Sequence, residues 1–427
     1  MGIRGVHSIL YESASAVWSG EQQPSERLAT VINKLNEKIE KDILVADDHL
    51  LTDEMARMTL EPSQEMRLRY FEAYLLRESS PVRHFKRAYQ VFEHALYLAD
   101  QHADLDSQIV LTGQLGLMKY GDALHHEAIS HYEVALELWQ QRERQLADPS
   151  AEPELYFRDR IGVSQFSIGE FDAAEGTLAR ILTVVKQRPD VPQTPELRAT
   201  AAKTLWTLGL IHRAQSDMQD GSETLLLRAL ERLEEALTTF RNVGEHEVNV
   251  GRLHIQIAET CLDLSDWYLQ RDQRKQANQA RQKARVNIVA AQSIPKYAND
   301  AFGPLLTELA LLRYEITRTL DADAARGLHA FELRLKALED LAAEGKSESL
   351  SAKCATLRGE WLLWLGDAPH AREAFVLALA GLRPDNMGEA TRPQRLLRRS
   401  NEEPREQPRA QRTRATGPRV SRPHKRP

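Results

Sequence analysis

The chain has 427 residues, of which 42% are hydrophobic and 6% aromatic, with 56 Lys and Arg against 62 Asp and Glu. This is the composition of a mildly acidic chain that is large enough for a sizeable core. Glycine and proline are scarce, with 21 and 18 residues, which argues against a turn-rich all-β protein. No run of 18 or more apolar residues occurs, so the sequence predicts no transmembrane helix and no contact with a membrane.

The cysteines and the first residues indicate the compartment. The two cysteines, Cys261 and Cys354, lie 93 residues apart, which is incompatible with a disulfide-dense scaffold or a CxxC ligand pair. Residues 1–20 contain no apolar stretch of the length that a secretory signal needs. We therefore expect a cytoplasmic protein.

Residues 1–64 are predicted to form an N-terminal helical cap. Apolar residues recur at helical spacing between Ser25 and Leu44, and Pro24 and Ser25 are typical of a helix start. A second short helix is expected after Thr52 and before Pro62. Terminal units of a solenoid cover the exposed end of its core. An oligomerisation helix is the rival interpretation of the same pattern.

From residue 65 onwards, small and aromatic residues recur at i, i+4 and i+7. This spacing places all three on one face of a helix. The small residues allow a neighbouring helix to approach closely, and the aromatic ring fills the space between the two helices. The clearest copies are Ala88, Phe92 and Ala95, then Ala128, Tyr132 and Ala135, and finally Ala371, Phe375 and Ala378.

Glycines mark a second helix upstream of these small-residue helices. Gly116, Gly162 and Gly209 each follow a Leu or Ile. Gly169 and Gly366 are predicted to form the turn between two antiparallel helices, since glycine accepts the left-handed conformation that ends a helix. Each unit is therefore predicted to be a helical hairpin.

These residues resemble the tetratricopeptide repeat (TPR) family, in which a Leu-Gly pair, a turn glycine and an Ala-aromatic-Ala helix follow one another. The best match combines Gly359 and Gly366 with the Ala371 copy. Three further copies depart from the pattern: Gly162, Gly169 and Ala174 lack the later aromatic, Ala229 and Ala236 arrive eight residues late after Gly209, and Ala277 and Ala284 follow Ser265 in place of glycine.

The resemblance implies an all-α, right-handed superhelical solenoid of about six or seven antiparallel hairpins over residues 65–382. The late alanines after Gly209 predict a long turn from Asp217 to Thr224. A gap of 94 residues between the helix-B alanines Ala277 and Ala371 leaves room for a degenerate copy around residues 314–325.

A search for catalytic and metal motifs gives no candidate. His126 and His131 are five residues apart, whereas a zinc helix needs an i, i+4 pair. Gly345-Lys346-Ser347 copies the end of a phosphate loop, but it lacks the upstream glycine and follows a predicted helix. No nucleophile elbow or dinucleotide fingerprint occurs. We expect no catalytic residues, no metal and no cofactor, and an enzyme is the least favoured class.

The TPR resemblance implies a concave surface, lined by the first helix of each hairpin, that binds a protein or peptide segment. The rival interpretation places its aromatic residues in the core. The residues that the alignment turns inward are Tyr120, Asp159, Phe166, Lys203, Trp206, Arg213, Asp266 and Trp364.

Two functional classes follow. The first is a non-catalytic scaffold that binds a protein or peptide ligand. The second is the ligand-sensing repeat portion of a bacterial transcription or signalling regulator, because Ala236-Leu237, Phe240 and Gly244 resemble the repeat rhythm of such proteins. A regulator of this kind would act through a partner, since no helix-turn-helix pattern is evident in the first 60 residues.

Residues 383–427 differ from the rest of the chain. They contain twelve Arg and one Lys against five acids, and seven of the 18 prolines. The segment is predicted to be disordered because it has too few apolar residues to bury. Binding of nucleic acid is conceivable only through these arginines, but a solvated appendage or a shifted reading frame is the preferred interpretation.

Overall fold

A computed structural model describes residues 62–79, 81–146, 151–187, 194–244, 246–318, 324–345, 347–383 and 386–401. These residues contain helices and turns but no strand. The predicted N-terminal cap therefore lies outside the described residues, except for residues 62–64, which begin the first described helix.

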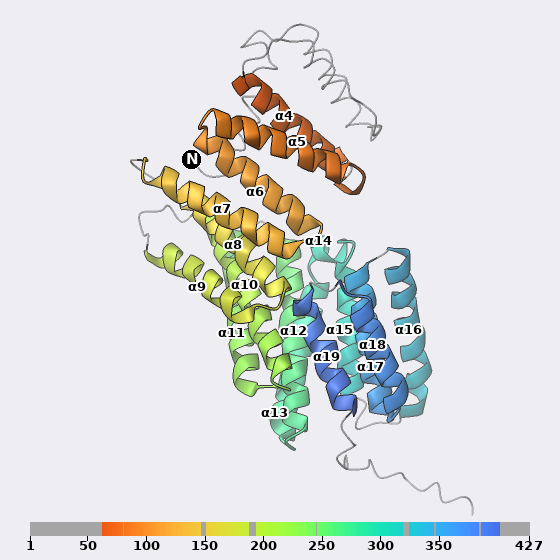
Figure 1. Cartoon of the computed structure of the whole chain (residues 1–427). Coiled ribbons are helices and arrows are strands. Elements are labelled where there is room, and N and C mark those ends of the chain that lie inside the picture. The colour runs from red at the N-terminus through yellow and green to blue at the C-terminus, as the bar shows by residue number, and fades with distance from the viewer. Residues whose placement is uncertain are drawn as a thin grey trace, which may run out of the picture.

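The helices pair into seven antiparallel hairpins in the described part of the chain, and these stack in sequence (Figure 1). This arrangement confirms the predicted all-α solenoid of helical hairpins. The pairs are α4 (Pro62–Ser79) with α5 (Pro81–Gln101), α6 (Leu105–Gly121) with α7 (His125–Glu143), α8 (Glu152–Ser167) with α9 (Phe171–Gln187), α10 (Pro195–Met218) with α11 (Glu223–Val243), α12 (Glu247–Leu269) with α13 (Arg274–Gln292), α15 (Gly303–Arg318) with α16 (Ala324–Glu344), and α17 (Glu348–Leu365) with α18 (Ala368–Ala380).

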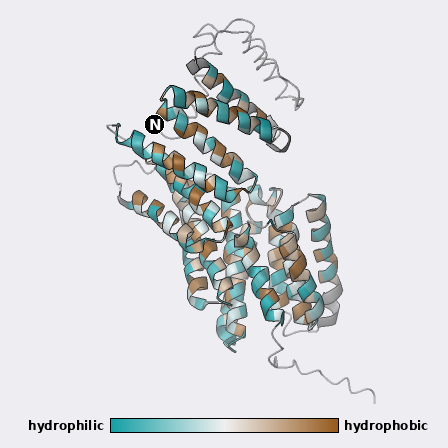
Figure 2. Ribbon diagram, in the orientation of Figure 1, coloured by the Kyte–Doolittle hydropathy of each residue, from teal (hydrophilic) through white to brown (hydrophobic). Residues whose placement is uncertain are grey.

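Two further helices do not belong to a hairpin. The short helix α14 (Pro295–Ala298) connects the fifth hairpin to the sixth, and α19 (Met387–Asn401) follows the last. Along the hairpin helices, hydrophobic and hydrophilic residues alternate around the ribbon (Figure 2), as expected where one side of each helix packs on its neighbours.

The small and aromatic residues of the repeat form the contacts between paired helices. Ala88, Phe92, Ala95, Ala128, Tyr132, Ala135, Ala174, Ala229, Ala236, Ala277, Ala284, Ala371, Phe375 and Ala378 are all fully buried.

The glycines of the first helices lie directly against these side chains. A Cβ atom added to Gly116 would lie 2.8 Å from the ring of Tyr132, and one added to Gly359 would lie 2.3 Å from the ring of Phe375. Gly162 and Gly209 approach a leucine of the second helix in the same way. The glycine is required at these positions because any side chain would separate the two helices.

Turn glycines close the hairpins as the pattern predicts. Gly169 and Gly366 have φ values of +86° and +83°, in the left-handed region that favours glycine. The N–H of Gly366 donates to the carbonyl oxygens at the end of α17, which caps that helix. Gly244, with φ of +87°, ends α11 in the same way.

The long turn predicted from Asp217 to Thr224 is wrong. Helix α10 continues to Met218 and α11 begins at Glu223, so the turn contains residues 219–222 only. Asp217 is buried at the end of α10. The eight extra residues between the repeat positions are therefore accommodated by longer helices, which also lengthen the hairpin interface.

The degenerate copy expected around residues 314–325 coincides with the end of α15 and the start of α16. In the rejected phosphate-loop motif, the segment before Gly345 is helical, as expected, and Ser347 has another role. Its hydroxyl oxygen accepts from the N–H of Leu350 and caps α17.

The glycine contacts give a direct test of the fold. Replacing Gly359 with alanine should lower the free energy of unfolding by about 2 kcal/mol, because the new methyl group overlaps the ring of Phe375. Gly176 is the matched control, since it is an exposed glycine of α9 with open space around it. Gly176→Ala should leave stability unchanged or raise it by up to about 1 kcal/mol. Urea unfolding followed by circular dichroism distinguishes the two, and equal effects would contradict the packing described.

Candidate ligand-binding groove

Helix α19 lies against the first helices of several hairpins, between α12 and α17 in Figure 1. It packs on α8 and α10 on one side and on α17 and α18 on the other. We define the groove as the surface that α8, α10, α12, α15 and α17 present to α19. Segments far apart in the sequence meet there.

The carboxylate of Asp263, in α12, lies at the centre of the groove and is 1% exposed. Its Oδ2 accepts from Arg213 Nε of α10 at 2.7 Å, and its Oδ1 accepts from Arg313 Nη2 of α15 at 2.7 Å. Arg392 of α19 also donates to Oδ1, and Arg395 Nη2 lies 3.9 Å from the same atom. One buried carboxylate thus holds arginines from three helices.

Glu360, in α17, extends this network to the last hairpin. It accepts from Arg392 Nε at 2.8 Å and from Arg392 Nη2 at 2.6 Å, both on Oε1. Its Oε2 accepts from Arg313 at 3.3 Å. Arg392 therefore links α12 with α17, and charge-assisted bonds of this kind are stronger than those between neutral groups.

The arginines of α19 follow the groove towards its other end. Arg395 Nη1 lies 3.0 Å from Asp217 Oδ1, with both side chains at most 7% exposed. Arg398 Nη2 lies 3.1 Å from Asp220 Oδ1 at the exposed rim. Together with Arg392, these residues recur every three positions, which places them along one side of the helix.

Other contacts position the first turns of α19 and its apolar side. Glu389 accepts from Ser349 Oγ at 2.8 Å and from Lys353 Nζ at 3.3 Å, both on α17. Gly388 lies against the ring of Phe166, where an added Cβ would be 2.6 Å from the ring. Leu396 is buried with Phe375.

The prediction that residues 383–427 are disordered is wrong for residues 387–401. That prediction counted apolar side chains, whereas α19 is held mainly by ion pairs to carboxylates of distant helices. A buried guanidinium is stable when it is paired and hydrogen-bonded. Residues 402–427 lie outside the described residues.

The network holds the pKa values of two of its carboxylates, Asp263 and Glu360, below their ordinary values. Burial raises the pKa of Asp263, but the guanidinium groups of Arg313, Arg392 and Arg213 outweigh burial and hold the pKa well below its ordinary value. Glu360 behaves alike: burial raises its pKa, and Arg392 and Arg313 lower it overall. Both groups are therefore ionised in the folded protein at neutral pH.

The structure brings three of the eight predicted groove residues to α19 and its network. Phe166 contacts Gly388, and Arg213 bonds Asp263 and Glu259. Asp266 lies 3.2 Å from Arg313, although burial raises the pKa of this carboxyl.

Three more predicted residues, Tyr120, Asp159 and Lys203, form a second group near Arg160 and Asp159. The guanidinium of Arg160 lies 6.0 Å from the ring centroid of Tyr120. The charges of Arg160 and Lys203 lower the pKa of the Asp159 carboxyl, but burial outweighs them and raises it overall.

The two predicted tryptophans pack against the hydrophobic core, as the rival interpretation expects. Trp364 stacks on Trp361 with ring centroids 5.0 Å apart and packs against the core of α15, α16 and α17. Trp206 packs against the core of α10 to α13.

Sequence reasoning missed the residues that carry most of the charge in the groove. For Glu360 a signal was present, because it directly follows the repeat glycine Gly359, just as Asp266 follows Ser265. Asp263 lies two residues before Ser265, on a side that the alignment does not turn inward. Arg392 and Arg395 had no signal, since α19 has no counterpart in the repeat.

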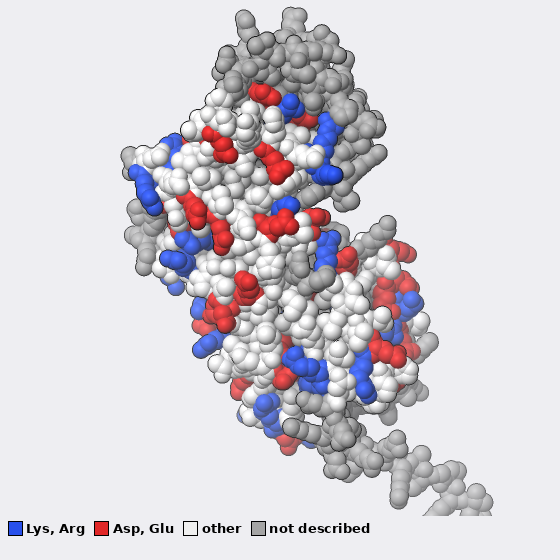
Figure 3. All heavy atoms as spheres, in the orientation of Figure 1, with Lys and Arg blue, Asp and Glu red and all other residues white. Residues whose placement is uncertain are grey.

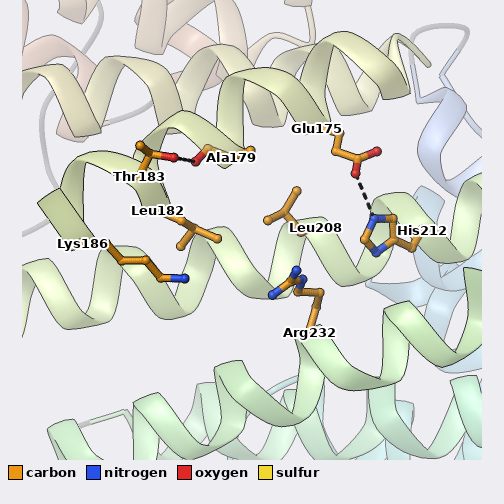
Figure 4. Close-up of a pocket in the computed structure, with 8 residues that line it drawn as sticks. All are labelled: Glu175, Ala179, Leu182, Thr183, Lys186, Leu208, His212 and Arg232. Carbon is orange, nitrogen blue, oxygen red and sulfur yellow. Dashed lines mark hydrogen bonds and ion pairs between the residues drawn. The ribbon is translucent and has the colours of Figure 1, made fainter.

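Away from the groove, a cavity of about 220 Å³ lies between α9, α10 and α11. Figure 4 shows the carboxylate of Glu175 facing the ring of His212, with 3.3 Å between Oε1 and Nε2. Lys186, Arg232 and two leucines complete this side of the lining. Thr183 donates its hydroxyl hydrogen to the carbonyl oxygen of Ala179. This lining contains a histidine and a carboxylate but no activated nucleophile.

Among the described residues, no group of three or more His, Cys, Asp or Glu is arranged to hold a metal ion. His131 instead makes a 3.3 Å contact between its Nε2 and the hydroxyl of Tyr89. Both cysteines are buried and unpaired, and burial raises the pKa of each thiol to about 12. Across the same part of the chain, no helix is long and apolar enough to span a membrane.

Comparison with known proteins identifies the fold. No family model matches the sequence, and no curated protein matches it. Two solved structures are similar over most of their length. The apo form of RapI is 10% identical, with a TM-score of 0.59 over 89% of this chain and 92% of that one. The apo form of the quorum sensor NprR from B. thuringiensis is 14% identical, with a TM-score of 0.56 over 89% of this chain and 97% of that one.

These likenesses show a shared helical-repeat fold across almost the entire length of the two neighbours. With the glycine and alanine contacts described above, they define the protein as a TPR-like superhelical solenoid. The resemblance found in the sequence is thereby confirmed for the fold.

The acidic network predicts a pH dependence of stability. A carboxyl whose pKa is lower in the folded state stabilises that state above its unfolded pKa, about 4 for Asp and Glu, and this contribution is lost as the pH falls through the folded pKa. The free energy of unfolding should therefore fall between pH 4 and pH 2.5. Urea unfolding at pH 7, 4 and 2.5 measures it. In Glu360→Gln the decrease should be smaller, and an identical pH profile in the variant would contradict this role.

Proposed function

We propose that this protein is a non-catalytic, cytoplasmic scaffold whose groove binds a segment of protein or peptide. The observation that carries the proposal is α19 itself, a basic helical segment seated in the groove through ion pairs with Asp263, Glu360 and Asp217.

 Glu360 and its neighbours show that the surface can desolvate and hold a polypeptide helix of about four turns. A surface that does this in cis has the shape and the charge to do so for a segment of a partner.

Unsatisfied polar atoms in the second group of predicted residues support the same proposal. Asp159 Oδ1, Arg160 Nε and Trp206 Nε1 are buried without a hydrogen-bond partner in the part of the chain that the structure describes. Buried polar groups are normally paired. Trp206 packs against the core, so Asp159 and Arg160 of α8 are the groups suited to a bound segment, with Tyr120 and Lys203 near them.

The residues that support binding do not form a catalytic arrangement. The buried arginines and carboxylates neutralise one another, and a reacting group would need to be activated rather than paired. The two buried thiols are protonated at neutral pH, since the pKa of each is raised to about 12. Free buried thiols are also typical of a reducing compartment.

A second candidate function is the ligand-sensing repeat portion of a bacterial regulator that acts through a partner. It is favoured by the similarity in fold to NprR, which is described as a quorum sensor, over 97% of that chain. The residues that suggested a regulator also have clear structural roles, because Phe240 is buried and Gly244 caps α11. In this case the bound segment would be a signal that changes how the solenoid meets its partner.

Photo-crosslinking tests the proposal on the full chain. A crosslinking side chain at Lys203, exposed on the first helix α10, should capture a polypeptide segment from a lysate of the source organism. The same side chain at Val286, exposed on the second helix α13, should not. The captured segment is then synthesised and its affinity for the full chain is measured by calorimetry.

Lys203→Trp should weaken binding of that synthetic segment at least tenfold, because the larger side chain obstructs the groove. Lys275→Trp is the matched control, since Lys275 is an exposed lysine of α13, and it should leave the affinity unchanged. Equal effects of the two substitutions, or capture at Val286 alone, would contradict binding in the groove.

A further inference from the structure

Helix α19 is more than a cap on the end of the solenoid. A terminal cap covers the apolar face of the last repeat, whereas α19 also packs on α8 and α10, from the third and fourth hairpins. It is joined to α18 by residues 381–386 only. The last segment of the described chain therefore returns to the middle of the groove, where a ligand would lie.

The groove has an excess of negative charge that α19 neutralises. The network contains five carboxylates from the solenoid and two of its arginines, Arg213 and Arg313. Helix α19 adds the half-buried Arg392 and the buried Arg395, and places Arg398 at the rim. The carboxylates are Asp217, Glu259, Asp263, Asp266 and Glu360.

The spacing of these contacts specifies what the groove accepts. Arginines at positions i, i+3 and i+6 meet Glu360, Asp217 and Asp220 in turn. A leucine at i+4, Leu396, packs beside Phe375. Arginine suits these sites better than lysine, because a planar guanidinium can bond two acceptors at once, as Arg392 does.

The sequence of α19 is poorly suited to form a helix by itself. Pro393 lies inside the helix, where it lacks an N–H for the ladder and crowds the preceding turn. Gly388, in the first turn, also has a low helix propensity. The helix is therefore held by its contacts with the groove, and it is a weaker occupant than an uninterrupted helix with the same arginines.

We propose that the partner is an arginine-bearing helical segment of another protein, and that α19 occupies its place until the partner displaces it. This inference rests on the proposed function and adds the class of ligand and its competition with α19. The short connection gives α19 a high effective concentration at the groove. A free segment therefore binds the intact protein weakly and binds tightly once the contacts of α19 are broken.

The test uses a fluorescent synthetic peptide of residues 386–401 that carries Pro393→Ala, titrated with the full chain by fluorescence anisotropy. The wild-type chain should bind this peptide weakly. The opened chain is the full chain with Arg392→Glu and Arg395→Glu, in which α19 is repelled by Asp263 and Asp217. It should bind the peptide at least tenfold more tightly. Lys275→Glu in the full chain controls for the general change in charge and should behave as wild type.

The peptide itself has a matched control in which both Arg392 and Arg395 are replaced by glutamine. This control should bind the opened chain at least tenfold more weakly, and 0.5 M NaCl should weaken binding of the arginine peptide. Equal binding by both peptides, or equal affinities of wild-type and opened chains, would overturn the proposal.

Circular dichroism verifies that the opened chain is folded. If it is not, hydrogen exchange of the wild-type chain gives the answer: excess arginine peptide should accelerate exchange in residues 387–401, and no acceleration would overturn the proposal. A segment captured at Lys203 that lacks the arginine pattern would contradict this inference alone. Failure to capture any segment in the groove would contradict the proposed function as well.

Discussion

The buried carboxylate of Asp263 is the constraint on which the arrangement of the groove depends. An ionised carboxylate at 1% exposure is stable only when cations and hydrogen-bond donors surround it. Arg213 of α10, Arg313 of α15 and Arg392 of α19 meet this requirement. Because these residues come from the fourth hairpin, the sixth hairpin and the final helix, the charge of one side chain fixes how distant parts of the solenoid face one another.

Two kinds of contact with different physical properties build the molecule. Within and between hairpins, glycine and alanine allow close approach of helices, as where Gly359 meets the ring of Phe375. Such contacts are specific in shape and insensitive to salt. Across the groove, ion pairs to α19 are specific in charge and weaken where water enters. Acidic and basic side chains are interspersed over the face shown in Figure 3, so this face carries no large field of one sign.

Much of the fold could be predicted from the sequence because the repeat depends on local spacing. The Ala128, Tyr132 and Ala135 pattern identifies a helix and its buried face at once, and Gly169 and Gly366 mark turns. The groove was harder to predict. Glu360 was recognisable from its register beside Gly359, but α19 and its contacts depend on pairs such as Arg392 with Asp263, which are 129 residues apart. Composition alone suggested a solvated tail, since it shows that arginines are present but not which carboxylates receive them.

Hydrogen–deuterium exchange of residues 387–401 in the full chain tests most directly whether α19 is held in the groove. Because α19 contains Pro393 and is a poor helix former by itself, slow exchange would have to come from its contacts with Asp263, Glu360 and Asp217. We predict that these amides exchange at least tenfold more slowly than in a free peptide of the same residues, and that Glu360→Gln reduces this protection. Exchange as fast in the full chain as in the free peptide would contradict the occupied groove.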